Sequence, residues 1–354
     1  MKTVLNFKQR INSEQPMFFG EPLGILSLTD VKYPKFVELF KKQRGQFWQP
    51  DEIALVNDRK DYEQLTKEER FIFEKNLSFQ TAGDSFLSRS IDEMKKHCSL
   101  NELSYCLNTW SFFEESIHSD SYNWILENLR RDPHRFFDDM SQDKHLQERM
   151  NEIKSSFDKL LNNDSGDQKQ DLFNSVLHMQ IMEGVIFYVS FACSFFFGYK
   201  GKMTGNADII KLIKRDESDH VGITQNIIRN WKDREDEGFM HIVRENEQRV
   251  YDAYGLAVEK EKQWADYIFS EGGLLGLNAN TLGGYIEWIA NNRLQSLGYK
   301  KIFDIKHNPI GGWLDSYLDA GKTHDLPQEK PLTDYIKGSR DTSIDLNQFT
   351  GFQL

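Results

Sequence analysis

The sequence predicts an all-α protein built as a large helical bundle. Apolar residues recur every three to four positions over several long stretches, which is the spacing of one helix face. The longest apolar run, Val185 to Phe197, is 13 residues long. That is too short to span a bilayer, so we expect it at the buried centre of the bundle. The spacing Glu-x-x-His also occurs twice inside such periodic stretches.

Composition limits the function classes. The chain has 354 residues, a formal net charge of −11 and three cysteines. A negative chain is not drawn electrostatically to nucleic acid or to an anionic membrane surface, so neither is expected as a partner. Three cysteines give no disulfide framework and no signal peptide precedes them, which indicates the reducing cytoplasm. We expect residues 1–320 to form the helical domain and 321–354 a flexible tail.

Helix signals place the elements of the first half. Residues 1–28 show no sustained period and are expected to form an arm on the body. Thr66 and Glu69 have the spacing of a capping box, which predicts the start of a helix whose apolar stripe includes Asp84. Ser99 and Glu102 repeat that spacing before the next helix. Residues 133–165 are polar and are expected to be a connection with one solvated helix.

The second half is predicted in the same way. A helix is expected to run from about Asp167 through Glu183 and to stop at Gly198. Asn206 can cap the helix that follows. Further helical periodicity covers 240–265 and 280–297, whereas the glycines of 272–276 lack a dinucleotide-binding pattern.

One predicted helix gathers three chemically active side chains. Glu115, His118 and Tyr122 are spaced i, i+3 and i+7, so on a regular helix they lie nearly one above another. Glu114 competes with Glu115, but on a regular helix it points about 100° away and lacks the histidine three residues on. We therefore assign the metal ligand to Glu115.

The Glu-x-x-His spacing occurs a second time, which makes a coincidental match a poor explanation of it. Glu217 and His220 repeat Glu-x-x-His, and each copy follows a carboxylate in apolar helical sequence, Asp84 in one case and Glu183 in the other. The six candidate metal ligands are therefore Asp84, Glu115, His118, Glu183, Glu217 and His220. Two helices that each give a carboxylate and two that each give Glu-x-x-His form the ligand set of ferritin-like di-iron carboxylate proteins. Such a set suits two iron or manganese ions better than a closed zinc site.

The periodicity also predicts the surroundings of the two ions. Phe187 and Phe191 follow Glu183 by four and eight residues, and Ile213 precedes Glu217 by four, so these three side chains would wall one side of the cluster. Tyr122 facing that wall would be shielded from water, as a long-lived oxidised phenol requires. An ordinary buried tyrosine bonded to a ligand is the other interpretation. Asp216, beside Glu217, could orient a ligating histidine.

Over nearly its full length the chain resembles the small (β) subunit of class I ribonucleotide reductase. The resemblance rests on the six spaced ligands, on His118-Ser-Asp-Ser-Tyr122 and on the string that begins at Phe187. It implies a homodimer that activates O₂ at two metal ions, most simply iron with manganese possible, and stores a tyrosyl radical on Tyr122. It implies that Phe187, Phe191 and Ile213 form the radical pocket. It further implies a path for the oxidising equivalent through Trp48, Asp216 and His118, with Tyr335 as the relay in the tail.

The C-terminus fits this resemblance. From about Gly321 the chain is polar and contains proline, yet its last residues, 349–354, are again partly apolar. By resemblance this end docks on the large subunit; the alternative is a tail packed on its own bundle. Two other functions stay open: an oxidase that acts on a ligand or hydrocarbon at the same two ions, and an iron-storage protein.

Overall fold

The structure, a computed structural model, describes residues 4–8, 11–129, 132–234 and 237–318. Within these residues every regular element is a helix, and the only β-type pairings are two isolated bridges, Phe18 with Cys98 and Leu274 with Leu277. The all-α prediction is confirmed. The predicted tail, 321–354, and Tyr335 within it lie outside the described residues.

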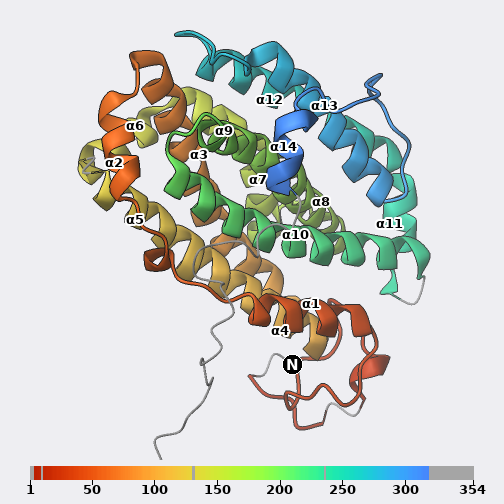
Figure 1. Cartoon of the computed structure of the whole chain (residues 1–354). Coiled ribbons are helices and arrows are strands. Elements are labelled where there is room, and N and C mark those ends of the chain that lie inside the picture. The colour runs from red at the N-terminus through yellow and green to blue at the C-terminus, as the bar shows by residue number, and fades with distance from the viewer. Residues whose placement is uncertain (1–3, 9–10, 130–131, 235–236, 319–354) are drawn as a thin grey trace, which may run out of the picture. The chain divides into compact units, whose positions relative to one another are not determined.

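The helices follow one another with short connections (Figure 1). In chain order the α-helices are α1 Pro34–Gly45, α2 Val56–Gln64, α3 Lys67–Lys95, α4 Asn101–Phe112, α5 Ser119–Asn128, α6 Pro133–Gln142, α7 Lys144–Asn162, α8 Gln168–Ile181, α9 Phe187–Tyr199, α10 Thr204–Asp233, α11 Met240–Glu245, α12 Glu247–Ile268, α13 Ala279–Ser296 and α14 Gly311–Leu318. Short 3₁₀ turns occupy η1 Asn12–Glu14 and η2 Pro50–Glu52.

Two of the long helical rods contain a wide turn. A π-helical segment, η3 Phe113–His118, joins α4 to α5, and another, η4 Met182–Ile186, joins α8 to α9. In a π-helix the backbone amide bonds to the carbonyl five residues back, so one turn holds more residues than in an α-helix. Each π-turn contains residues predicted to bind metal.

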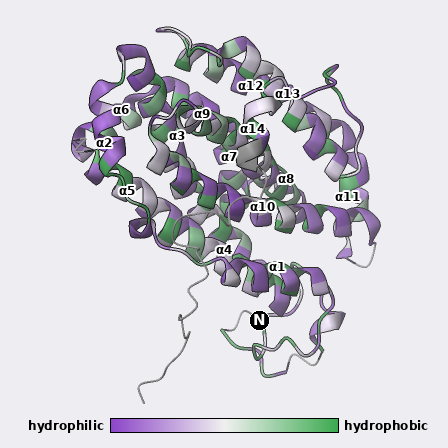
Figure 2. Cartoon of the chain, in the orientation of Figure 1, coloured by the Kyte–Doolittle hydropathy of each residue, from purple (hydrophilic) through white to green (hydrophobic). Residues whose placement is uncertain are grey.

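The two rods pack with α3 and α10 around a common interior. Helix α10 lies against α8 and α9, while α3 contacts α4, η3 and α9. Figure 2 shows hydrophilic residues along the outward sides of α1 and α10. The rod Gln168–Tyr199 is long and apolar enough to cross a membrane, but 94% of its most apolar window is buried among the other helices. It is therefore the core of a bundle, as its sequence predicts.

Some predicted helix starts agree with the structure. The Thr66 hydroxyl accepts a hydrogen bond from the Glu69 amide at 3.2 Å, and the Glu69 carboxylate accepts one from the Thr66 amide at 3.0 Å, which completes the capping box. Asp167 caps α8 by accepting from the amides of Lys169 and Gln170. Cap chemistry that is local in sequence is thus predicted correctly.

Three other local predictions are wrong. Ser99 does not cap α4, because its hydroxyl donates to the carbonyl of Pro16 in the N-terminal arm. Asn206 lies inside α10, whose first amides are bound instead by Asp58 from α2. Residues 133–165 carry two helices, α6 and α7, where one was expected. The two capping predictions fail because the bonding partner is far away in sequence. The third fails because the break between α6 and α7 is very short.

Candidate metal centre

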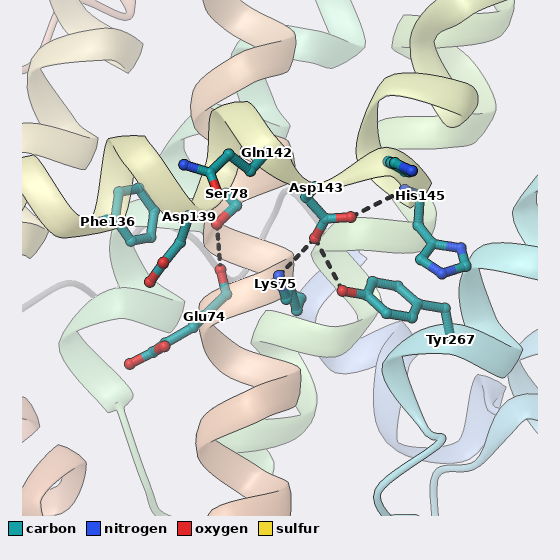
Figure 3. A pocket seen from close by; sticks show the side chains of 10 residues that line it. Glu74, Lys75, Ser78, Phe136, Asp139, Gln142, Asp143, His145 and Tyr267 are labelled. Atoms are coloured by element: carbon teal, nitrogen blue, oxygen red, sulfur yellow. Dashed lines mark hydrogen bonds and ion pairs between the residues drawn. The ribbon is translucent and has the colours of Figure 1, made fainter.

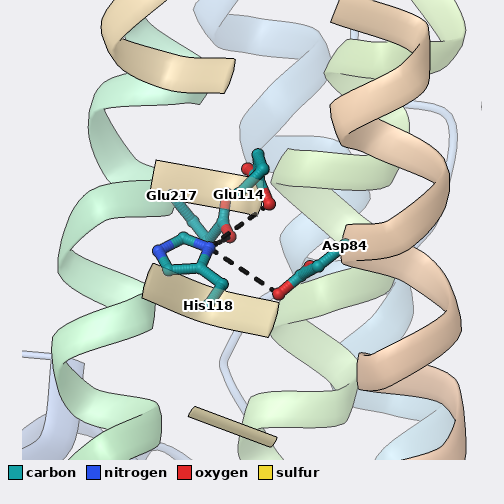
Figure 4. A group of neighbouring side chains, drawn as sticks. All are labelled: Asp84, Glu114, His118 and Glu217. Carbon is teal, nitrogen blue, oxygen red and sulfur yellow. Dashed lines mark hydrogen bonds and ion pairs between the residues drawn. The ribbon is translucent and has the colours of Figure 1, made fainter. Parts of the chain in front are cut away.

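Six acidic and histidine side chains converge at the centre of the bundle. They form two groups of four, each with ligand atoms within 4.8 Å of one another: Asp84, Glu114, His118 and Glu217 in one, and Glu114, Glu183, Glu217 and His220 in the other. Glu114 and Glu217 belong to both groups, so they lie between the two positions. All six residues are buried. Figure 4 shows the first group, with Asp84 from α3 facing His118 and Glu217 across the interior.

The structure does not bring Glu115, the predicted ligand, into the cluster, and Glu114 lies there instead. The side chain of Glu115 is 56% exposed and lies 3.5 Å from Arg89 at the surface, whereas Glu114 is fully buried. The physical reason is η3: with more residues per turn, positions four apart are superposed instead of positions three apart. Glu114 and His118 therefore face the same point, and their Oε2 and Nδ1 atoms lie 3.3 Å apart.

The other five predicted side chains lie where the sequence places them. Glu183 sits in η4, the π-turn of the second rod, and is fully buried. Glu217 and His220 lie in the regular helix α10, where the i, i+3 spacing holds, and their Oε2 and Nδ1 atoms are 2.8 Å apart. Asp84 comes from α3. The structure thus brings together Asp84, His118, Glu183, Glu217 and His220.

The donor atoms fit divalent cations. Four buried carboxylate oxygens of the cluster, Asp84 Oδ1, both oxygens of Glu183 and Glu217 Oε1, accept no hydrogen bond among the described residues. Buried polar atoms are normally paired, so a set of orphaned oxygens aimed at one point is typical of an ion site. The four carboxylates carry up to four negative charges, which two divalent ions would balance. Carboxylate oxygens with two imidazoles are ligands that iron and manganese accept.

Burial and mutual repulsion shift the acidities of this cluster. Burial raises the pKa of Asp84 and Glu183 well above the ordinary range, and neighbouring carboxylates add to the shift. Burial alone would lower the pKa of His220, but the Glu217 carboxylate outweighs it and raises that pKa to about 9. The protein alone therefore retains protons at a site where a divalent cation would displace them.

A chain of contacts leads from the cluster toward α1. His118 offers Nδ1 to the cluster, while its Nε2 lies 3.4 Å from Asp216 Oδ2. The same Asp216 oxygen accepts a 2.8 Å hydrogen bond from the indole nitrogen of Trp48, which is 3% exposed. A carboxylate behind a ligating histidine fixes the orientation and tautomer of its ring. Asp216 Oδ2 thus contacts both Trp48 and His118 directly.

Tyr122 lies beside the cluster with no exposure to solvent. Its hydroxyl donates a 2.6 Å hydrogen bond to Asp84 Oδ2. Burial and the Asp84 charge raise the pKa of Tyr122 well above that of a free phenol, so its hydroxyl stays protonated. A neutral phenol is thereby held next to a metal-site carboxylate.

The predicted apolar wall is buried throughout. Phe187, Phe191 and Ile213 all have no exposed surface, and the Phe187 and Phe191 rings lie 5.7 Å apart. The Phe187 ring presses on Gly83, beside Asp84, so closely that a Cβ there would lie 2.8 Å from it. Phe187 therefore belongs to the immediate surroundings of the residue that binds the Tyr122 hydroxyl.

Sequence reasoning missed Trp110 as well as Glu114. Trp110 donates its indole N–H to Glu114 Oε1 at 2.9 Å and stacks on His220, with ring centroids 4.9 Å apart. It therefore contacts metal-cluster side chains from η3 and from α10. The adjacent pair Glu114-Glu115 was the one available signal, but only knowledge of the π-turn could choose between them.

The pockets at the surface lie elsewhere. The best defined has a volume of about 460 Å³ and is lined from α3, α6, α7 and α12. Figure 3 shows Lys75 and Tyr267 there, both bonded to Asp143. No metal-cluster residue lines this pocket or three other pockets at the surface of the described residues. The cluster is enclosed.

Comparison with known proteins agrees with this geometry. Residues 26–309 match the family model for the small chain of ribonucleotide reductase. The chain belongs to this family. It is 36% identical to the ribonucleoside-diphosphate reductase 1 subunit beta of Escherichia coli O157:H7, over 98% of this chain and 99% of that one. It is 35% identical to the subunit beta of Haemophilus influenzae, with the same coverage.

Solved structures of the family share the fold. The ribonucleotide reductase R2 subunit of Clostridium botulinum is 30% identical, with a TM-score of 0.81 over 89% of this chain and 98% of that one. A dimanganese(II) NrdF protein of Streptococcus sanguinis is 21% identical and has a TM-score of 0.69 over 82% of this chain and 98% of that one, which shows the common fold. The bundle is therefore ferritin-like, and its buried cluster is a dinuclear metal-binding site.

Membership in the family settles the class of activity. The chain is the beta subunit of a ribonucleoside-diphosphate reductase, an oxidoreductase whose small subunit works with a large one. No comparison favours a ligand-oxidising enzyme or an iron-storage protein. The one helix of the described residues that is apolar and long enough to span a membrane is buried in the core.

Proposed function

We propose that Asp84, Glu114, His118, Glu183, Glu217 and His220 hold two iron ions and that Tyr122 stores the oxidising equivalent as a tyrosyl radical. The observation that carries the proposal is the fully buried Tyr122 hydroxyl, bonded to Asp84 Oδ2 at 2.6 Å within the cluster. When bound, two reduced ions would supply the electrons that activate O₂. The same ligands also accept manganese. We prefer iron because the neighbouring phenol of Tyr122 favours a cofactor that stores a tyrosyl radical.

The protein's own residues would control the proton of Tyr122. Oxidation of a neutral phenol releases its hydroxyl proton, and Asp84 Oδ2 is already positioned to accept it. Burial of the ring keeps away water and small reductants that would quench the radical. Phe187, Phe191 and Ile213 would supply the apolar surroundings of the radical.

The path out of the cluster would use the contacts at His118. An oxidising equivalent could move between His118, Asp216 and Trp48 in short steps, because each is in contact with the next. Asp216 would hold the indole proton of Trp48 while the ring is oxidised. Tyr335 would then continue the path in the tail.

The experiment for Tyr122 is reconstitution of the metal-free protein. Fe(II) and O₂ are added, and absorption and electron paramagnetic resonance spectra are recorded. We expect a tyrosyl signal from the wild type and none from Tyr122→Phe, which should still bind two iron ions per chain. An unchanged radical signal in Tyr122→Phe would show that another residue stores the oxidising equivalent.

The tail supplies a second test. We propose that residues 321–354 dock on the large subunit and that the small subunit is a homodimer. We also propose that the small and the large subunit work in the cytoplasm. A chain that ends at residue 335 should assemble its cofactor normally but lose reductase activity with the large subunit. Full activity of the shortened chain would contradict docking through this segment. Gel filtration of the full chain reports the homodimer.

A further inference from the structure

The π-turn that carries Glu183 is held by arginines from two other helices. Amides in a π-turn bond five residues back, so the regular ladder is interrupted and carbonyls are freed for other donors. In η4 the Gly184 carbonyl accepts a 2.8 Å hydrogen bond from Nε of Arg293, on α13. The Ile186 carbonyl accepts a longer one, 3.4 Å, from Nη2 of Arg149, on α7. Both donors come from outside the rod that contains the turn.

Arg293 is fitted closely to this position. A Cβ on Gly184 would lie 3.1 Å from Arg293 Nε and 3.2 Å from its Cδ, so an alanine there would push the arginine side chain away from the turn by a few tenths of an ångström. The guanidinium carbon lies 4.6 Å from the centre of the Tyr188 ring, a favourable cation–π contact. Tyr188 is linked in turn to Ser218, next to Glu217, by a 3.0 Å hydrogen bond between the hydroxyls.

Among the described residues no hydrogen bond or ion pair joins Arg293 to a metal-cluster side chain, but Arg293 binds the backbone next to one. Glu183 is adjacent to Gly184 and belongs to only one of the two ligand groups. Both carboxylate oxygens of Glu183 lack hydrogen-bond partners among the described residues. The direction of its side chain is therefore set mainly by the backbone of η4. A shift of η4 would therefore misplace a ligand of one ion directly, whereas Asp84 and His118, which belong to the other group, come from other elements.

We propose that Arg293 is a positioning residue that selectively holds the metal position containing Glu183. Its hydrogen bond to the Gly184 carbonyl keeps the wide turn in the form that aims the Glu183 carboxylate inward. Gly184 is required because it lets the arginine approach. This inference rests on the dinuclear site proposed above.

The test is Mn(II) binding to the metal-free, full-length protein. Free Mn(II) is measured by its solution electron paramagnetic resonance signal during a titration. The wild type should bind two Mn(II) per chain. Arg293→Gln should keep one site unchanged and lose about tenfold in affinity at the other, the usual scale for residues that orient a ligand. Gly184→Ala should do the same, although it retains the arginine.

Matched variants control for general damage. Arg70, on α3, makes the same pair of contacts away from the cluster, a 2.8 Å bond to the Tyr62 carbonyl and a 4.6 Å approach to the Tyr62 ring. Gly255, in α12, has no atom within 4 Å of an added Cβ. Arg70→Gln and Gly255→Ala should both bind two Mn(II) with wild-type affinity.

The outcomes separate the two proposals. Wild-type binding at both sites of Arg293→Gln, or equal weakening of both sites, would overturn the positioning role. A wild type that binds fewer than two Mn(II) would instead count against the dinuclear site. Because the effects of Arg293→Gln and Gly184→Ala share one contact, the double variant should lose little more than either single variant.

Discussion

At the scale of single residues, the choice between Glu114 and Glu115 decides the metal site. The two neighbours are chemically identical, yet one is fully buried between both ligand groups and the other is paired with Arg89 at the surface. An argument from 3.6 residues per turn selects the exposed one. The types and the number of the candidate ligands can be predicted from the sequence. The choice between Glu114 and Glu115 depends on the backbone geometry of the π-turn.

Substitution distinguishes the two glutamates directly. Glu114→Gln should weaken Mn(II) binding at both positions, at least tenfold, because this carboxylate belongs to both groups. Glu115→Gln should bind two Mn(II) normally, since it removes only an exposed ion pair of small energetic value. If instead Glu115→Gln weakened Mn(II) binding and Glu114→Gln did not, the ligand would be Glu115, as regular helix spacing predicts.

At the scale of elements, predictions succeed where the deciding contact is local. The capping box of Thr66 and the cap of Asp167 involve partners within three residues, and both are present. The caps predicted at Ser99 and Asn206 fail because distant segments take over the bonding, through Pro16 in one case and Asp58 in the other. The second π-turn belongs to the second kind, since arginines from α13 and α7 donate hydrogen bonds to it.

The first π-turn contains its own donor. The Ser119 hydroxyl donates a 2.8 Å hydrogen bond to the Glu114 carbonyl, five residues back. Ser119→Ala should lower the free energy of unfolding by about 1 kcal/mol and weaken Mn(II) binding at both positions, because Glu114 serves both.

Ser78→Ala is the matched control for this prediction. Ser78 makes an equally short hydroxyl bond, to the Glu74 carbonyl, in the regular helix α3. Its removal should affect stability alone, as measured by urea unfolding beside the Mn(II) titration. Equal metal binding by the two alanine variants would show that the hydroxyl of Ser119 does not position Glu114.

At the scale of the whole molecule, one buried ion pair ties α7 to α12. Arg149 makes two 2.6 Å bonds to Glu261, and both side chains are almost entirely inaccessible. The guanidinium lies 3.5 Å from the centre of the Phe79 ring, which neighbours Phe187 at 5.5 Å between centroids. The apolar wall that contains Phe187 is thus backed by a charge pair that depends on both partners.

Removal of one partner should be costly. Glu261→Leu leaves a buried, uncompensated guanidinium and should lower the free energy of unfolding by about 3–5 kcal/mol in urea denaturation of the metal-free protein. Adding Arg149→Met should recover most of that loss, because an apolar pair needs no compensation. A double variant as unstable as Glu261→Leu would mean that packing of the arginine stem, and not its charge, dominates.

The three cysteines are all buried and unpaired. Burial raises the pKa of Cys98 and of Cys193 to about 12, and it raises that of Cys106 still further. Sulfur reacts with oxidants and with other thiols as the thiolate, a form these groups scarcely populate at neutral pH. A subunit that must handle dioxygen in its interior therefore presents it with buried, protonated thiols, and we expect no disulfide cross-linking between molecules when it is stored in air.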